Sequence, residues 1–409
     1  MNNPIQESLK NGLPVVFIPH KGVDALTIHL RGCVGSSYEK PDEIGAAHLT
    51  EHLLLQKNQN KVHFYGGRIV GVTARDNVLF MVKVLKDDFE RGLDFLSENL
   101  INETFNASDL EIQKRVATQE IKRHLEMPEK YIARVAYKNL FPGGRMATLN
   151  TGSIESVAKM ELETVESFRK RQYVSQNFIL VVCGNVEKGR VFEQGKKFFE
   201  KFPKGKRSEE IVHKTYPEFR VHLENRSHYK QTHLKIDYYG YGVGNGKRIA
   251  AECAANILEA YIKTKIQKVL GYAYRASCTS LSMGSYGIFS IYTATSHNNA
   301  LEALGEIKNF VDNKHRLLNK KIIEQVKNKM LADRAFAFEK TSMRADFYSG
   351  VWLHDSSSPT YQEEIESIKG LSEKDVENVF EEILEQQPKI TILSRRFEES
   401  AVKELWGAS

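Results

Sequence analysis

Among five consecutive residues, His48-Leu49-Thr50-Glu51-His52, two imidazoles and one carboxylate could bind a metal ion and activate water. On an α-helix, positions i and i+4 lie on one face, so the imidazoles of His48 and His52 could bind the same zinc ion. Glu51, at i+3, lies beside them and could take a proton from a water molecule. This H-x-x-E-H spacing favours metal-dependent hydrolysis.

The motif alone does not establish a metal site. The chain has 13 histidines among 409 residues, and an i,i+4 pair of histidines on a solvated helix is also a common structural feature. A catalytic zinc ion needs three protein ligands and an open position. The best candidate for the third ligand is Glu120, because it lies in a predicted helix over residues 107–125 that must pack near the first.

Alternation of apolar residues predicts a strand at 26–30, and the run Val78 to Leu85 predicts another. Helices are predicted at 46–55, which carries the histidines, and at 89–100, with Asp87 or Asp88 as its N-cap. The apolar run 178–183 is typical of a central strand. These elements must position the candidate ligands.

The second half repeats this order, with predicted strands at 234–238 and 286–294 and predicted helices at 250–266 and 301–311. The repetition indicates duplication. Residues 202–207, Phe-Pro-Lys-Gly-Lys-Arg, have the composition of an exposed linker. We therefore predict a zinc-binding domain over 1–205, a linker over 206–218, and a second, metal-free repeat of the same fold over 219–409, which has no such pair of histidines.

Composition is that of a globular protein, with 41% hydrophobic and 27% charged residues. The net charge of +6 is small for this length and does not favour nucleic-acid binding. No apolar run approaches the roughly 18 residues of a membrane span, and no secretory signal is recognisable, so we expect a cytoplasmic protein. The four cysteines lack C-x-x-C pairing and are expected to be buried thiols in a reducing compartment: Cys33, Cys183, Cys253 and Cys278.

Beyond the motif, an ordered series of segments resembles the inverzincin metallopeptidases of the pitrilysin, insulin-degrading-enzyme and mitochondrial-processing-peptidase family. The segments are Asn11-Gly-Leu-Pro-Val-Val and residues 45–52, 66–76, 117–120, 150–153 and 173–184. The resemblance implies a short, two-domain member with an α+β fold of the LuxS/MPP-like metallohydrolase type. Each of its two homologous α/β sandwich-like halves would contain an antiparallel-rich sheet covered by helices.

The resemblance also implies site residues. Glu120 falls where the family's third ligand lies, 120 − 52 = 68 residues after His52, which implies one Zn²⁺ per chain and Glu51 as the base. Gly71, Val72 and Thr73 resemble the edge to which the substrate backbone adds as a strand, the alternative being a plain edge strand.

Tyr274, in Gly271-Tyr-Ala-Tyr, is the candidate for contacting the substrate near the scissile bond. The alternative for Tyr274 is a buried aromatic residue with a satisfied hydroxyl. The family's Arg seven residues earlier is Gln267 here, and Lys265 or Lys268 could replace it as a donor.

A second departure from the family concerns the surroundings of the metal. The family often has a second Glu seven residues before the third ligand, whereas this chain has Gln113. An amide can still orient a ligand by a hydrogen bond, but it brings no negative charge.

The resemblance implies a zinc metalloendopeptidase for oligopeptides or a short precursor peptide. Family members enclose peptides between two two-domain halves, so a chain with one half is expected to form a homodimer, or a heterodimer with a related chain. Two alternatives stay open: a dedicated peptide-maturation protease acting with a sister subunit, and a non-catalytic structural subunit. The retained ligands His48, His52 and Glu120, with Glu51, argue against the latter.

Overall fold

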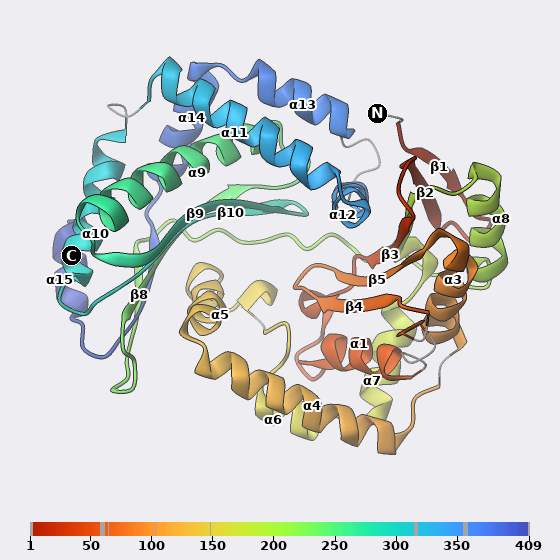
Figure 1. Ribbon diagram of the computed structural model, residues 1–409. Coiled ribbons are helices and arrows are strands. Elements are labelled where there is room, and N and C mark those ends of the chain that lie inside the picture. Colours follow the sequence, from red (N-terminus) through yellow and green to blue (C-terminus); the bar gives the residue numbers. More distant parts are fainter. Residues whose placement is uncertain are drawn as a thin grey trace. The chain divides into compact units, whose positions relative to one another are not determined.

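The computed structural model describes residues 3–57, 62–63, 65–102, 104–147, 149–314, 318–354 and 359–407. The chain forms two compact units, each assembled from three segments (Figure 1). The first comprises Met1–Ile121, Thr148–Ile211 and Arg334–Tyr361, and the second Lys122–Ala147, Val212–Asp333 and Gln362–Ser409. Each unit contains one sheet covered by helices, which confirms the predicted fold class.

The first unit contains a six-stranded sheet in the order β1-β2-β6-β3-β5-β4. Its strands are β1 (Ile5–Ser8), β2 (Pro14–Pro19), β3 (Ala25–Gly32), β4 (Arg68–Thr73), β5 (Val78–Leu85) and β6 (Phe178–Gly184). The predicted apolar strand β6 lies inside the sheet and is buried at every position, parallel to β2 and antiparallel to β3. β4 is an edge strand, antiparallel to β5.

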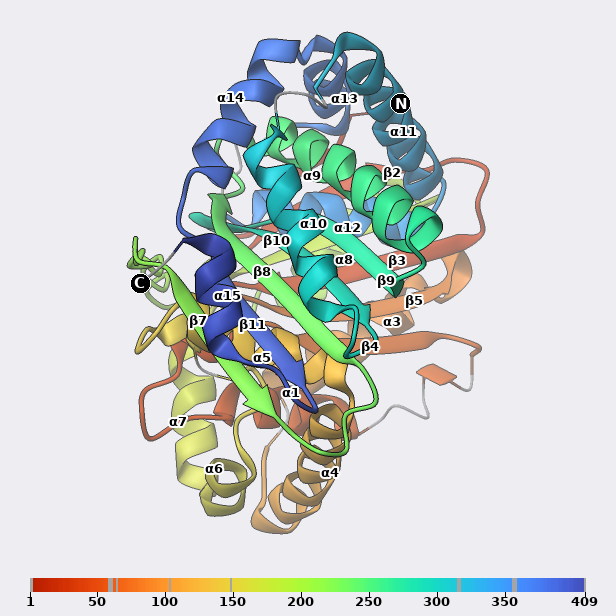
Figure 2. The same ribbon diagram turned by 90° about the vertical axis from the view of Figure 1, so that its left-hand side faces the viewer.

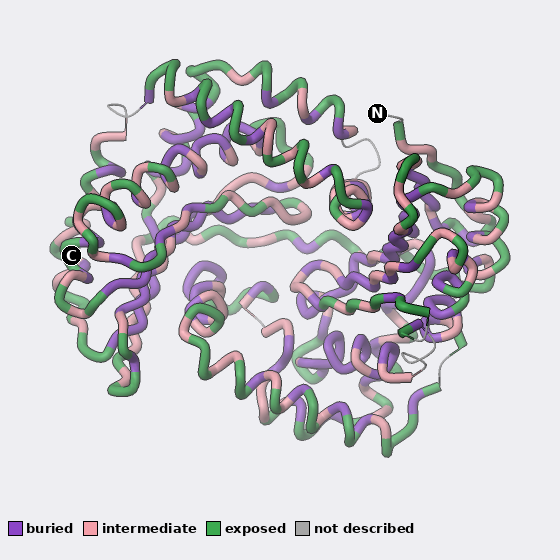
Figure 3. The backbone as a smooth tube through the Cα atoms, viewed as in Figure 1, coloured by how far each residue is buried: buried purple, intermediate pink, exposed green. Residues whose placement is uncertain are grey.

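Helices of the first unit are α1 (Ala46–Gln56), α3 (Phe89–Ser97), α4 (Ala107–Glu126), α6 (Ile154–Lys159), α7 (Leu162–Gln172), α8 (Lys188–Phe199) and α12 (Thr341–Trp352). The last residues of α4 belong to the second unit. α1 contacts β4 and α7 and is buried along most of its length (Figure 3). A π-helix, Glu98–Asn102, follows α3, so the predicted helix 89–100 changes its hydrogen-bond pattern near its end.

α12 comes from the second half of the sequence but packs on β3 and β6 of the first sheet. Its contacts with β3 include polar ones, because alternate residues of that strand, Thr27, His29 and Arg31, face it. Hydrogen bonds or ion pairs join Thr27 to Thr341, His29 to Ser349 and Arg31 to Asp346. Burial lowers the pKa of His29 to about 3, with a further lowering by Arg31, so this side chain stays neutral.

The second unit contains a five-stranded sheet in the order β7-β11-β8-β10-β9. Its strands are β7 (Arg220–Asn225), β8 (Thr232–Tyr241), β9 (Ala273–Met283), β10 (Tyr286–Thr295) and β11 (Lys389–Ser394). Its helices are α5 (Pro128–Leu140), α9 (Arg248–Ile262), α10 (Ala300–Asp312), α11 (Lys320–Phe338), α13 (Tyr361–Gly370), α14 (Glu373–Leu384) and α15 (Glu399–Trp406). α11 begins in this unit and ends in the first.

One face of the second sheet packs against α9, α10, α14 and α15 around an apolar core that includes Leu234, Ile236 and Phe310 (Figure 2). α5, from the first half of the sequence, covers β8 and β11 on the other face. In sequence, the predicted linker region 206–218 lies between the strands of the first sheet and those of the second. α5 precedes this region but belongs to the second unit, and α12 follows it but belongs to the first. The division into domains at 1–205 and 219–409 therefore stays a prediction.

Candidate metal centre

The helix α1 begins at a backbone position that favours glycine. Gly45 has φ of 102°, in the left-handed region, and glycine has no side chain that could cap the helix. The carboxyl group of Glu39 serves instead, because its Oε1 accepts a hydrogen bond of 2.8 Å from the Ala47 amide. Burial raises the pKa of Glu39 to about 8. The start of the histidine-bearing helix is therefore fixed by a preceding loop.

Three nitrogen and oxygen atoms converge where the sequence predicted a metal site. Nε2 of His48 and Nε2 of His52 lie 3.2 Å apart, and Oε2 of Glu120 lies 3.5 Å and 3.6 Å from them. Ligand atoms bound at about 2.1 Å to a tetrahedral zinc ion lie about 3.4 Å from one another. The spacing therefore fits one zinc ion, and this is the one His, Cys, Asp and Glu cluster of that kind found in the described part of the chain.

The charges in this cluster favour an ionised carboxylate. Hydrogen bonds from His48 and His52 lower the pKa of Glu120. Burial lowers the pKa of His52, but its hydrogen bond to Glu120 and the negative charge of Glu51 outweigh that effect, and the net shift is upward. The site thus attracts positive charge, whether protons or a cation.

Gln113 lies beside His52, one of the candidate ligands. Its Oε1 is 3.1 Å from Nδ1 of His52, while its Nε2 donates a 2.7 Å hydrogen bond to Oε1 of Gln56. Because Oε1 of Gln113 can only accept, Nδ1 of His52 carries a proton, so Nε2, the nitrogen that faces Glu120, is the atom that would bind a metal in the neutral ring. Nδ1 of His48 is buried without a hydrogen-bond partner among the described residues.

Glu51 is buried next to the edge strand β4. Its Oε2 accepts a 2.9 Å hydrogen bond from Oγ1 of Thr73, and its other oxygen lies where a side chain on Gly71 would be. Val72, between them, is 46% exposed. The three predicted edge residues therefore do lie on an edge strand, while substrate binding by them stays a prediction.

Tyr274 lies in the second unit, near the start of β9, and is 92% exposed. The alternative of a buried aromatic residue is therefore excluded. Gln267 donates a 2.8 Å hydrogen bond to the carbonyl oxygen of Tyr274, and Lys265 lies 3.9 Å from Glu306. A contact between Tyr274 and substrate stays a prediction.

Sequence reasoning missed three contacts of this site. Gln56 could have been found, because it lies four residues after His52 on the same helix. Glu39 stands in a loop without any recognisable spacing to the motif. Thr73 was singled out for its place on the edge strand and not for its hydrogen bond to Glu51.

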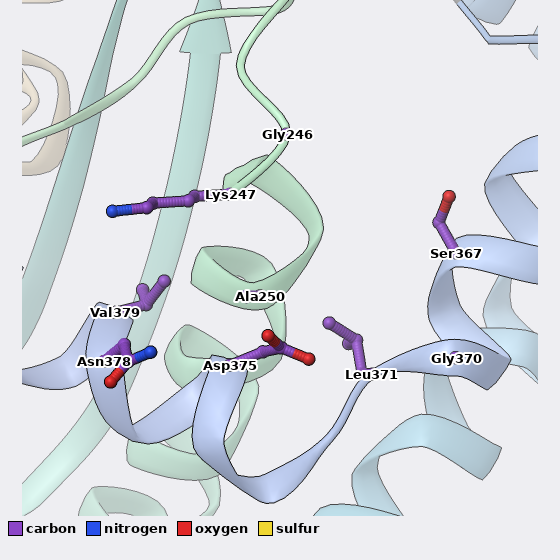
Figure 4. A pocket seen from close by; sticks show the side chains of 9 residues that line it. All are labelled: Gly246, Lys247, Ala250, Ser367, Gly370, Leu371, Asp375, Asn378 and Val379. Atoms are coloured by element: carbon purple, nitrogen blue, oxygen red, sulfur yellow. The ribbon is translucent and has the colours of Figure 1, made fainter.

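Cavities in the second unit include two that are lined by described residues. One, of about 340 Å³, is lined by Lys247, Asp375 and Asn378, among others, at the start of α9 and α14 (Figure 4). The other, of about 200 Å³, lies between α5 and the sheet over the Lys235–Asp237 ion pair. Neither is lined by a predicted site residue. Across the described helices, none is long and apolar enough to span a bilayer.

Two family models match the chain in sequence. Residues 15–148, with all the candidate ligands, match "Insulinase (Peptidase family M16)", and residues 159–330 match "Peptidase M16 inactive domain". Relatives named as uncharacterized zinc proteases include one from Rickettsia bellii, 22% identical over 83% of this chain and 84% of that protein, and YmxG from Bacillus subtilis, 22% identical over 82% and 84%.

The mitochondrial-processing peptidase subunit beta of Caenorhabditis elegans is 22% identical over 52% of this chain and 48% of that subunit. In fold, a protease from Helicobacter pylori matches with a TM-score of 0.89 at 18% identity, covering 96% of this chain and all of that one (100%). A chain of complex III2 from Candida albicans matches with a TM-score of 0.84 at 14% identity, covering 98% and 99%. With both family models in their expected order, this chain belongs to peptidase family M16.

Proposed function

We propose that this chain is a zinc metalloendopeptidase that hydrolyses oligopeptides or a short precursor peptide. The observation that carries the proposal is the convergence of His48, His52 and Glu120 at distances that fit one zinc ion, with Glu51 one residue away from a ligand. The names of the zinc-protease relatives support the same reaction class.

In the proposed mechanism, His48, His52 and Glu120 hold the metal, two as neutral imidazoles and one as a carboxylate. Bound zinc supplies Lewis-acid polarisation of a water and of the substrate carbonyl. Glu51 accepts the proton of the attacking water and passes it to the leaving amine nitrogen as the peptide C–N bond breaks. Tyr274, with its exposed hydroxyl, is proposed as a donor to the developing oxyanion or a neighbouring carbonyl.

The proposed substrate site is the free edge of β4. An edge strand offers backbone groups on the side that has no neighbouring strand, so an extended peptide can add along Gly71, Val72 and Thr73 as another strand. The carbonyl oxygen of Thr73 already accepts a hydrogen bond from Asn150, so the pairing would use other backbone groups of this segment. Such backbone pairing fixes register and demands little of the substrate's sequence. Partly exposed Val70 and Val72 leave apolar surface for its side chains.

The assembly we propose is a dimer, either of two copies or with a related chain. The relative that is a subunit of mitochondrial-processing peptidase and the fold neighbour from complex III2 support pairing of M16 chains. A dedicated maturation protease with a sister subunit is the second candidate, favoured by Gln113 and Gln267 in place of the family's charged residues. Light scattering on the purified chain distinguishes monomer from dimer. Four free, buried cysteines support a reducing, cytoplasmic compartment.

A third candidate is a non-catalytic subunit. The match to the inactive-domain model covers only residues after 159, whereas the complete ligand set lies before it. The retained ligands therefore favour catalysis.

The test combines zinc stoichiometry with cleavage of a generic quenched peptide. The wild-type chain should bind one zinc ion and cleave, whereas Glu51→Gln should bind zinc and lose at least about 1,000-fold in kcat, because no base remains. Glu111→Gln, an exposed change on α4, is the matched control. Zinc binding without generic cleavage would favour the dedicated protease, and absence of zinc would favour the structural subunit. Full activity of Glu51→Gln would overturn the mechanism.

A further inference from the structure

The edge strand β4 holds the proposed base as well as offering a free edge. Oγ1 of Thr73 donates a 2.9 Å hydrogen bond to Oε2 of Glu51, and the exposed fractions of the two residues are only 6% and 8%. A hydrogen bond to a buried carboxylate is stronger than one between neutral groups, and such a carboxylate pays a large penalty when left without donors. This contact therefore restricts where the carboxylate can lie.

Thr73 is itself rigidly placed. It is the last residue of β4 and pairs with Val78 of β5. Its carbonyl oxygen accepts a 3.1 Å hydrogen bond from Nδ2 of Asn150, and Ala74 begins a tight turn through a 2.8 Å hydrogen bond to Asn77. The hydroxyl is thus fixed by the sheet and by a second segment of the first unit, independently of α1.

Beside Thr73, Gly71 leaves room for the same carboxylate. A Cβ on Gly71 would overlap Oε1 of Glu51 and the side chain of Leu55. The hydroxyl therefore engages one carboxylate oxygen, while the missing side chain accommodates the other. Thr73 supplies the hydroxyl and Gly71 the space, from alternate positions on the same face of β4.

We propose that Thr73 is a positioning residue, whose hydroxyl holds Glu51 in the orientation that accepts the proton of the attacking water. The inference rests on the proposed peptidase function and assigns Thr73 a role distinct from backbone contact with substrate. Backbone pairing uses the N–H and C=O groups of β4, which substitution of the side chain leaves in place. The two roles therefore predict different kinetics.

The experiment compares Thr73→Val, which keeps the shape but removes the donor, with Thr73→Ser, which keeps the donor. Thr73→Val should lower kcat about tenfold or more, with KM within about twofold and zinc content unchanged. Thr73→Ser should recover most of kcat. If Thr73→Val does not fold, Thr73→Ala against Thr73→Ser gives the same comparison.

Thr50→Val is the matched control. Thr50 is buried on α1 next to Glu51, but within the described residues its hydroxyl donates to the carbonyl of Ala46, one turn earlier in the same helix, and not to Glu51. The same chemical change there should leave kcat unchanged. A wild-type kcat in Thr73→Val, a change in KM alone, or equal losses in Thr73→Val and Thr73→Ser would each overturn the proposal.

A second readout needs no activity. In the metal-free protein, Thr73→Val should lower the Tm by about 2–4 °C, and this loss should disappear in a Glu51→Ala background, since no carboxylate is left to pair. An equal loss in both backgrounds would refute the coupling. If the wild-type chain cleaved no peptide, the proposed function would fail. The comparison of Tm losses in the two backgrounds would still decide whether Thr73 holds Glu51.

Discussion

Replacing Gln113 by Met should weaken zinc binding although all three proposed ligand residues stay in the chain. Met keeps the length of the side chain but removes the oxygen that lies 3.1 Å from Nδ1 of His52. Without that acceptor, the imidazole loses the contact that selects its tautomer and its ring orientation. The ring then reaches its metal-binding state less often.

The size of this effect follows from the neutral hydrogen bond. Such a bond contributes about 0.5–1.5 kcal/mol net, which corresponds to about 2- to 12-fold in a dissociation constant. We therefore expect the zinc Kd of Gln113→Met to rise about 5- to 10-fold. Gln113→Glu should lower it by a similar factor, because a carboxylate acceptor roughly doubles the strength of the bond and adds negative charge. For that, the amide of Gln56 must turn so that its nitrogen donates.

The assay is competition between the protein and a chromophoric zinc chelator at constant pH and ionic strength. Gln119→Met, at an exposed position on the same helix α4, is the control and should bind zinc as the wild type does. Unchanged Kd in Gln113→Met would refute the reasoning that this amide orients His52. If Gln113→Met bound zinc more tightly than the wild type and Gln113→Glu less tightly, the amide of Gln113 would weaken zinc binding and not strengthen it.

Two further predictions concern the ligand Glu120 and the helix-capping Glu39. Zinc at about 100 times its Kd should stabilise the wild type by about 2.7 kcal/mol and so raise its Tm by at least several degrees. Glu120→Ala should show almost no increase in Tm. An undiminished increase in this variant would point to another ligand. Glu39 has a pKa raised by burial from 4.5 to about 8, so the folded chain holds this proton more tightly than the unfolded chain. Its contribution to stability is complete below about pH 4.5 and is lost as the pH rises toward about 8. Glu39→Gln keeps an acceptor for Ala47 and cannot ionise, so its Tm should fall less than that of the wild type between about pH 5 and about pH 8; equal falls would contradict this account.

Local periodicity predicted the elements that carry the site. The strand 78–85 and the helix beginning at Ala46 agree with the structure, because apolar spacing and the turn at Gly45 are encoded in adjacent residues. The predicted helix 250–266 was less well placed, since α9 ends at Ile262 and continues as a π-helix to Val269. A π-helix leaves no distinct sequence period.

The site was predicted as far as its residues lie in one motif or in a family position. His48 and His52 follow from helical spacing, and Glu120 from its helix and the resemblance. The contact between Thr73 and Glu51 joins residues 22 apart in sequence across a strand and a helix, and no local pattern encodes it. α12 is a stronger case, because its polar contacts with β3 join residues more than 300 positions apart.

α5 and α12 each belong to the unit formed mainly by the other half of the sequence, so neither unit is complete when its own half of the chain has been synthesised. The first sheet is complete in sequence once β6 has been made, yet the helix that covers Thr27, His29 and Arg31 is synthesised about 160 residues later. Until then these polar groups lack the partners that α12 gives them in the folded chain. A chain truncated after the predicted linker region 206–218 would contain every proposed zinc ligand. It would still lack α12, the helix that packs on β3 and β6 of the same unit. The unit that holds the candidate metal ligands is therefore complete only when a segment from the C-terminal half of the sequence has joined it.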